Sequence, residues 1–178
     1  MSRDDDFEDP EVLAALALAL PAPAAPAHLR ARVLASIEKT GRFEAFAEKV
    51  AELIDCALDK ARQLVALIDD AAAWKVGPLG TQLIDLPSGP RIAHADAGFI
   101  RLPAGTKFPH HRHLGDEVAL ILQGGYVDSS GRDFRPGDVD AKAAGSEHAF
   151  TVFADVDLIQ LVVLEKGIEI EGLPGVSL

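Results

Sequence analysis

The chain has 178 residues, of which 48% are hydrophobic and 25% charged, and its formal net charge is -11. A chain of this length and composition can bury a sizeable core and is typical of one globular domain with an appendage. The acidic balance argues against direct binding to nucleic acid or to an anionic membrane, because both need clustered Lys and Arg.

The first 27 residues are predicted to form an acidic tail, a short apolar helix over 11–20 and a proline-rich spacer over 21–26. The apolar stretch is cut by Pro21 well before membrane-spanning length, and no basic segment precedes it. We therefore expect neither a targeting signal nor a transmembrane segment, and a cytoplasmic protein. The single cysteine, Cys56, excludes an internal disulfide and fits a reducing compartment.

A helical region is predicted over 28–76. Apolar residues recur at three- and four-residue steps over 28–38, 43–53 and 58–68, which indicates amphipathic helices. The region carries no basic stripe of the kind that reads DNA. Its apolar residues, Cys56 included, are more typical of a protein core than of a docking surface. Gly77 and Pro78 mark the end of the region.

From residue 77 to 178 the hydrophobic period changes to two, and β-branched residues become more frequent, which predicts a mainly β domain. The expected strands lie at 81–86, 91–102, 106–113, 117–123, 125–128, 132–135, 138–143, 149–153 and 157–165. Strands 117–123 and 157–165 are apolar on both faces. The N-terminal helices or a second subunit must cover their outer faces, and we expect a homodimer.

Four side chains in this domain have the spacing of a single metal site. His111 and His113 are two residues apart, so on a strand both rings point to the same side, and Glu117 has the same parity. His148 comes from a separate strand and completes the set. Three nitrogens and one oxygen suit zinc, iron(II), manganese, nickel or cobalt, and the spacing does not choose among them. By the same parity His110 points away, and it is expected at the surface together with His94.

The glycines around these ligands complete a recognisable motif. Gly105, five residues, His111-x-His113, three residues, Glu117, six residues and Gly124 resemble the first cupin motif at every position. The resemblance implies a single cupin, an RmlC-like jelly-roll barrel, with the metal inside it and a short helical region before it.

A second motif is partly kept, with Gly137, then Gly145, and His148 as the last ligand. The order of short helices, proline-rich spacer and cupin is similar to that of ChrR-type cupins associated with anti-sigma factors. This resemblance implies a regulatory or sensor protein with one divalent transition metal per chain, zinc first and iron, manganese or nickel as alternatives. It also implies a sigma factor as partner of the helices. In the family an N-terminal zinc is held by a His-x3-Cys-x2-Cys motif; here Arg32 follows His28 in place of the first cysteine, so that zinc motif is absent.

The same ligand set would also serve a mononuclear metal enzyme, such as an iron dioxygenase or an isomerase acting on a small molecule. The pocket lining would distinguish the two classes. Its polar candidates are Arg101, Tyr126 and Lys142. Arg101 has the chemistry of a carboxylate clamp, but a solvated arginine at the barrel rim is the more common case and the one we expect. The expected apolar lining consists of Phe99, Ala119, Ile121, Ala143 and Phe150.

Overall fold

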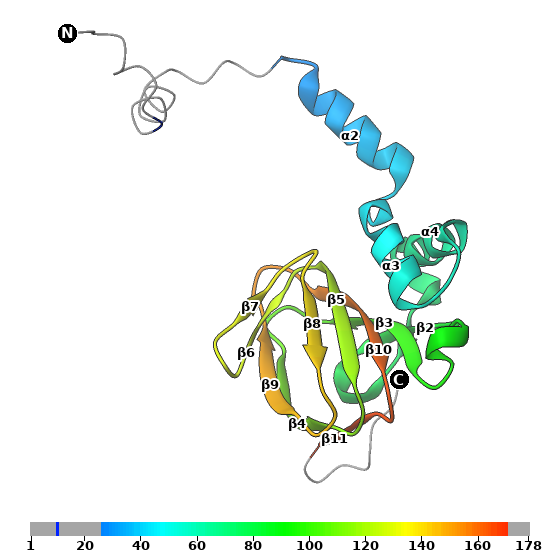
Figure 1. The fold of residues 1–178 in the computed structure, drawn as a ribbon. Helices are drawn as coiled ribbons and strands as arrows, with labels where there is room; N and C mark the ends of the chain where they lie inside the picture. The colour runs from blue at the N-terminus through cyan, green and yellow to red at the C-terminus, as the bar shows by residue number, and fades with distance from the viewer. Residues whose placement is uncertain (1–9, 11–25, 171–178) are drawn as a thin grey trace, which may run out of the picture. The chain divides into compact units, whose positions relative to one another are not determined.

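The structure is a computed structural model that describes residue 10 and residues 26–170, the side chains of 35–40 excepted. The predicted tail, the helix over 11–20 and nearly all of the spacer lie outside these residues. The chain divides into two compact units, Met1–Lys39 and Thr40–Leu178. Figure 1 shows the second unit as a β-barrel with short helices. The predicted segments 1–27, 28–76 and 77–178 stay a prediction about the organisation of the chain.

Short helices occupy the N-terminal side of the described chain, as predicted. Helix α2 begins within the first unit, and the others belong to the second. Their bounds are α2 Leu29–Thr40, η2 Glu44–Phe46, α3 Ala47–Leu53, α4 Leu58–Ala66, η3 Leu67–Asp69, η4 Ala71–Ala73, η5 Pro78–Gly80 and η6 Pro90–Ile92.

Eleven strands in the described residues form two antiparallel sheets with the orders β1-β2-β3-β10-β5-β8 and β11-β4-β9-β6-β7. Their bounds are β1 Lys75–Val76, β2 Gln82–Leu86, β3 Asp96–Leu102, β4 Lys107–His113, β5 Glu117–Gln123, β6 Tyr126–Asp128, β7 Asp133–Phe134, β8 Val139–Lys142, β9 Glu147–Val152, β10 Leu158–Leu164 and β11 Ile168–Ile170. The mainly β cupin barrel predicted from the sequence is confirmed.

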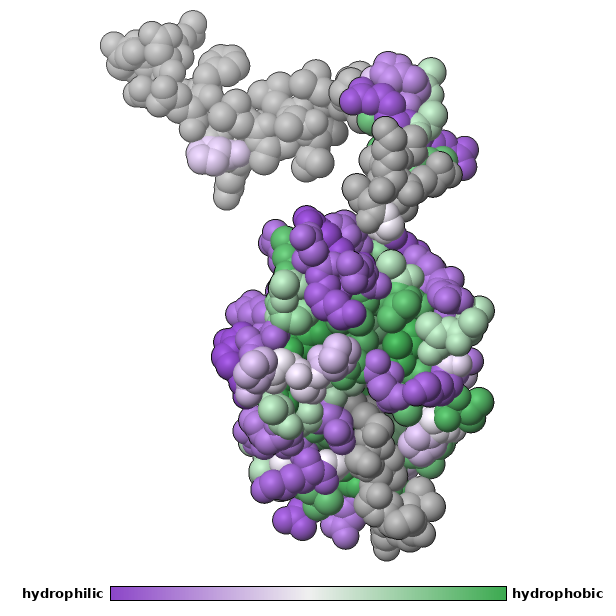
Figure 2. Space-filling model, turned by 90° about the vertical axis from the view of Figure 1, so that its right-hand side faces the viewer, coloured by the Kyte–Doolittle hydropathy of each residue, from purple (hydrophilic) through white to green (hydrophobic). Residues whose placement is uncertain are grey.

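Helices α3 and α4 cover the outer face of the first sheet. Val50, Ile54 and Leu64 on the helices share one buried cluster with Leu120 on β5 and Leu161 on β10. This accounts for the two apolar faces of both strands, because the inner residues fill the barrel while the outer residues meet the helices. The cover is therefore intramolecular. Figure 2 shows mostly polar residues on the visible surface of this unit, with an apolar area among them.

The prediction of a strand over 91–102 was wrong in its first part, because the strand begins only at Asp96. Residues 90–92 form a 3-10 turn that docks on the end of α3. The backbone N–H and Nε of Arg91 donate to the Asp55 carboxylate at 2.8 and 2.7 Å, and the N–H of Gly89 donates to the Ile54 carbonyl at 2.9 Å. These tertiary contacts outweigh the local strand pattern. Strands β1 and β11 were not predicted.

Candidate metal centre and cavity

Strand β4 presents two histidines to the barrel interior. His111 and His113 are buried, whereas His110 between Pro109 and His111 is exposed, as the strand parity predicted. The pairing of β4 with β9 is irregular between Phe108 and His111, where Pro109 lacks the N–H that a regular ladder would use. Beyond this irregularity the two-residue period holds, so both rings project to the same side.

His148 on β9 faces His111 directly, since the two residues are register partners across the sheet. The ring centroids of His111 and His148 are 4.4 Å apart, and those of His113 and His148 are 5.2 Å apart. One ring nitrogen from each of the three histidines lies within 4.8 Å of the others. The loop before His148 is tied to β4, because the N–H of Gly145 donates to the His113 carbonyl at 2.8 Å. The fold thus brings together three of the predicted ligands and could hold a metal ion there.

The hydrogen bonding of the rings fits a metal. Both ring nitrogens of His113 and both of His148 are buried without a hydrogen-bond partner, which is costly unless another group occupies them. His111 is oriented by its Nδ1, which lies 2.9 Å from the Pro109 carbonyl and leaves Nε2 free to ligate.

Burial also keeps two of these rings neutral. It lowers the pKa of His148 to about 3, with a further contribution from His111, and it lowers the pKa of His111 although the Pro109 carbonyl opposes this. A neutral imidazole is the form that binds a metal, so protons do not compete for these rings near neutral pH.

Glu117 lies beside the cluster at the start of β5. Its Oε2 is 3.3 Å from Nδ1 of His113, a close contact without the geometry of a hydrogen bond, and its side chain is 16% exposed. The bend between His113 and Glu117 passes so close to Glu165 that a Cβ at Gly115 would lie 2.5 Å from the Glu165 carbonyl oxygen. Asp116 holds the bend on both sides, with its side chain accepting from the N–H of Ala144 and its carbonyl from the N–H of Glu165. The predicted carboxylate is therefore placed where it could join the three histidines.

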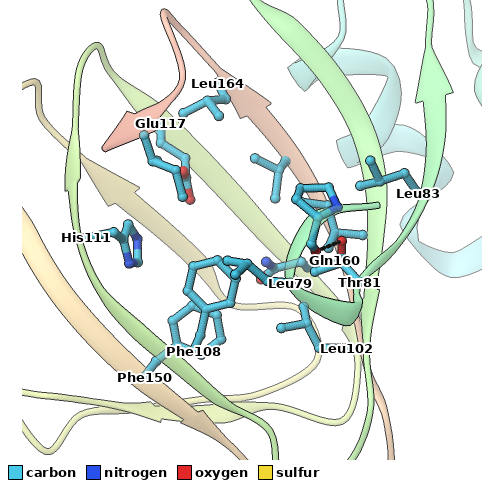
Figure 3. A pocket seen from close by; sticks show the side chains of 14 residues that line it. Leu79, Thr81, Leu83, Leu102, Phe108, His111, Glu117, Phe150, Gln160 and Leu164 are labelled. Atoms are coloured by element: carbon cyan, nitrogen blue, oxygen red, sulfur yellow. Dashed lines mark hydrogen bonds between the residues drawn. The ribbon is translucent and has the colours of Figure 1, made fainter. Parts of the chain in front are cut away.

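A cavity of about 70 Å³ adjoins the cluster, and both His111 and Glu117 line it (Figure 3). Most of its remaining wall is apolar and comes from both sheets and from the η5 turn. The other lining residues are Pro78, Leu79, Thr81, Leu83, Ile100, Leu102, Phe108, Phe150, Gln160, Val162, Leu164 and Ile168. A small molecule in this cavity would touch the ligand set on one side and mostly hydrocarbon on the others.

Most of the predicted pocket lining lies elsewhere, and Phe150 is the one expected residue that lines the cavity. Phe99 faces the helices on the outside of the sheet. Arg101 is not free to clamp a substrate, because its Nε and Nη2 donate to the Asp157 carboxylate at 2.9 and 2.7 Å. Parity along one strand could not decide these cases, because it does not say which face of a strand meets the helices.

Tyr126 and Lys142 form a separate buried network instead. The Tyr126 hydroxyl donates to Oδ2 of Asp140 at 2.7 Å, and Nζ of Lys142 lies 3.0 Å from Oδ1 of the same carboxylate. Burial, and then the bond to Asp140, raise the pKa of Tyr126 above its usual range. Lys142 is the register partner of Glu117, so this network stands next to the candidate ligands.

The sequence reasoning missed Gln160, a buried polar residue of the cavity wall. Its signal is present in the sequence, because Gln160 is the single polar residue of the strand Leu158–Leu164, in which every residue is buried. It lies on the same face as Leu158, Val162 and Leu164, and this face lines the barrel interior.

A barrel of two antiparallel sheets with three clustered histidines inside it is the arrangement of a cupin. More narrowly, residues 62–166 match the family described as the ChrR cupin-like domain. The chain belongs to this family.

Two relatives carry the name of the family. The anti-sigma-E factor ChrR of Cereibacter sphaeroides is 30% identical over 92 residues, which are 52% of this chain but 41% of that protein. The crystal structure of Rhodobacter sphaeroides SigE in complex with the anti-sigma ChrR has a TM-score of 0.52 at 23% identity, covering 87% of this chain and 75% of the other.

A solved structure of an enzyme is also similar in part. An acetylacetone dioxygenase from Acinetobacter johnsonii has a TM-score of 0.49 at 17% identity, covering 61% of this chain and 78% of that one.

The helices that the structure describes include none with the length and apolar character needed to span a membrane.

Proposed function

We propose that this protein is a cytoplasmic regulator of the anti-sigma type, in which the cupin holds one divalent transition metal and acts as the sensor. His111, His113, Glu117 and His148 are the proposed ligands, and zinc is the first candidate. The observation that carries the proposal is the set of four buried ring nitrogens on His113 and His148 that have no hydrogen-bond partner. A metal would satisfy the nitrogens that face it and would explain why the imidazoles converge.

Elemental analysis of protein purified without oxygen tests the metal centre. We expect close to one metal per chain in the unaltered protein and large losses in His111→Ala and in His148→Ala. Both variants should also melt at lower temperature, because metal bound only by the native state adds its binding free energy to folding. His110→Ala is the matched control, since its exposed ring lies one residue away on the outer face. Unchanged metal content in both ligand variants would refute the assignment.

The proposed partner of the helical region is a sigma factor. The relative at 30% identity is named an anti-sigma-E factor, and α2 displays apolar side chains, with Leu29 41% and Leu34 50% exposed. Recognition would have to work without the N-terminal zinc motif, since Arg32 stands where its first cysteine would be.

Coexpression of the full chain with sigma factors of its native organism tests the partner. We expect one of them to copurify, and we expect the combined change Leu29→Asp and Leu34→Asp to abolish copurification. Arg30→Gln on the same helix is the control and should retain the partner. Equal capture by all three proteins would show that α2 is not the contact.

A second candidate function, a mononuclear metal enzyme, is favoured by one observation, the cavity that reaches His111 and Glu117. A substrate oxygen could bind beside the ligands there. Oxygen uptake with diketones, thiols and keto acids tests it in iron-loaded protein. Turnover that is lost in His111→Ala would favour the enzyme, whereas zinc without any uptake would favour the regulator.

The homodimer expected from the sequence stays a prediction. We expected it because the outer face of β5 and β10 is apolar, and α3 and α4 already cover that face. Sedimentation equilibrium of the full chain would decide between a monomer and a dimer.

A further inference from the structure

Gln160 is a buried polar side chain without a role in the protein's own hydrogen bonding. It is 6% exposed, and its Oε1 has no hydrogen-bond partner. Its neighbours across the sheet are Ile100 and Ile121, which offer no polar side chain. An unsatisfied buried amide costs stability, so its presence in an otherwise apolar strand calls for a partner from outside the chain.

The amide is aimed into the cavity. Figure 3 shows Gln160 reaching from β10 toward the space between His111 on one side and Leu79, Thr81 and Leu83 on the other. Thr81 cannot serve as its donor, because the Thr81 hydroxyl donates to the Pro78 carbonyl at 2.7 Å. The polar groups facing the cavity are therefore the amide and, across from it, the ligand set.

The charged side chains in and near the cavity wall indicate which net charge a ligand can carry. Among the described residues that line the cavity there is no Lys or Arg, and the nearby candidates are engaged, Arg101 by Asp157 and Lys142 by Asp140. Of the lining residues that the structure describes, Glu117 alone is acidic. In the metal-free protein, an anionic ligand would lose its water against hydrocarbon without gaining a guanidinium or ammonium partner. A neutral molecule does not incur this desolvation cost.

We infer that this cavity binds a small, uncharged, largely apolar molecule that carries a hydroxyl group, with the hydroxyl on Gln160. A hydroxyl both donates and accepts, so it can satisfy Oε1 and still accept from the amide Nε2. The apolar body lies against Leu102, Val162 and Leu164. This inference deepens the proposed sensor function by naming the ligand class of its cupin, and it depends on the metal only in that His111 and Glu117 share the cavity.

Binding of three probes of similar size to the full chain tests the inference. Hexan-1-ol has the apolar body and the hydroxyl, its isomer dipropyl ether lacks the donor, and hexanoate carries a charge. Chemical shifts of the isoleucine, leucine and valine methyl groups would report both affinity and location. In chelator-treated protein we expect hexan-1-ol to bind about two- to tenfold more tightly than dipropyl ether, the range given by one net hydrogen bond, and hexanoate to bind most weakly.

The variant Gln160→Leu separates the amide from the cavity. We expect it to bind hexan-1-ol and dipropyl ether equally and to melt at a higher temperature without ligand, because an apolar side chain replaces an unsatisfied amide. Gln82→Leu, at an exposed position of β2, is the control and should keep the preference. In chelator-treated protein, a preference retained in Gln160→Leu, tightest binding of hexanoate, or no shift at the lining methyl groups would each overturn the inference. Titrations of zinc-loaded and chelator-treated protein distinguish its failure from that of the metal proposal, because metal content is measured separately.

Discussion

Acidification of the metal-free protein should destabilise it through His148. The ring is 7% exposed, and burial lowers its pKa in the folded state from 6.5 to about 3. The unfolded chain therefore binds a proton that the folded chain refuses at every pH between these two values. The contribution of His148 to the free energy of unfolding is present above pH 6.5 and is lost as the pH falls toward 3.

The magnitude follows from the same two values. Between pH 7 and pH 5 the unfolded imidazole becomes almost fully protonated while the folded one stays neutral, so the free energy of unfolding falls by about 2 kcal/mol. His111 adds to the loss in the same direction, because burial lowers its pKa as well. Carboxylates contribute little in this window, since their ordinary pKa values lie below it.

Urea unfolding at both pH values, followed by the fluorescence of the single tryptophan, Trp74, measures the effect. The chelator-treated protein should lose about 2 kcal/mol or more between pH 7 and pH 5. His148→Asn should lose less over the same interval, whereas His110→Asn, changed at an exposed ring, should match the unaltered protein. A free energy of unfolding that is equal at both pH values, or an undiminished loss in His148→Asn, would refute the reasoning.

Two further predictions concern the contacts that hold the barrel and its helices. Gly89→Ala should cost about 1–3 kcal/mol in urea unfolding, because its Cβ would lie 1.9 Å from the Asp55 carbonyl oxygen and would push the 3-10 turn off α3; a loss under about 0.5 kcal/mol would contradict the close approach. Tyr126→Phe should cost about 1–3 kcal/mol, because Asp140 loses a buried donor at 2.7 Å, and an unchanged midpoint would show that Lys142 alone satisfies the carboxylate.

Most strands of the barrel, and the shared direction of His111 and His113, were predictable because they depend on short-range periodicity. The two-residue period of β4 places His111 and His113 on one face whatever the rest of the chain does, and the glycine spacing locates the bends around them. The same argument put His110 at the surface, where it is. Amphipathic spacing likewise predicted the helices that pack on the sheet.

Contacts between distant segments were decided only by the tertiary structure. The three-residue strand β11 is too short to carry a periodic signal, and it forms by pairing with His111 and His113 on β4. The strand expected from residue 91 yields to a turn because Arg91 binds Asp55, 36 residues earlier. The lining of the cavity also depends on contacts between distant segments. Arg101 has clamp chemistry in the sequence, yet Asp157 engages it in the fold. Gln160 gains its importance because its Oε1 finds no hydrogen-bond partner among the described residues. Local pattern determines which way a side chain points, but only packing determines what it meets there.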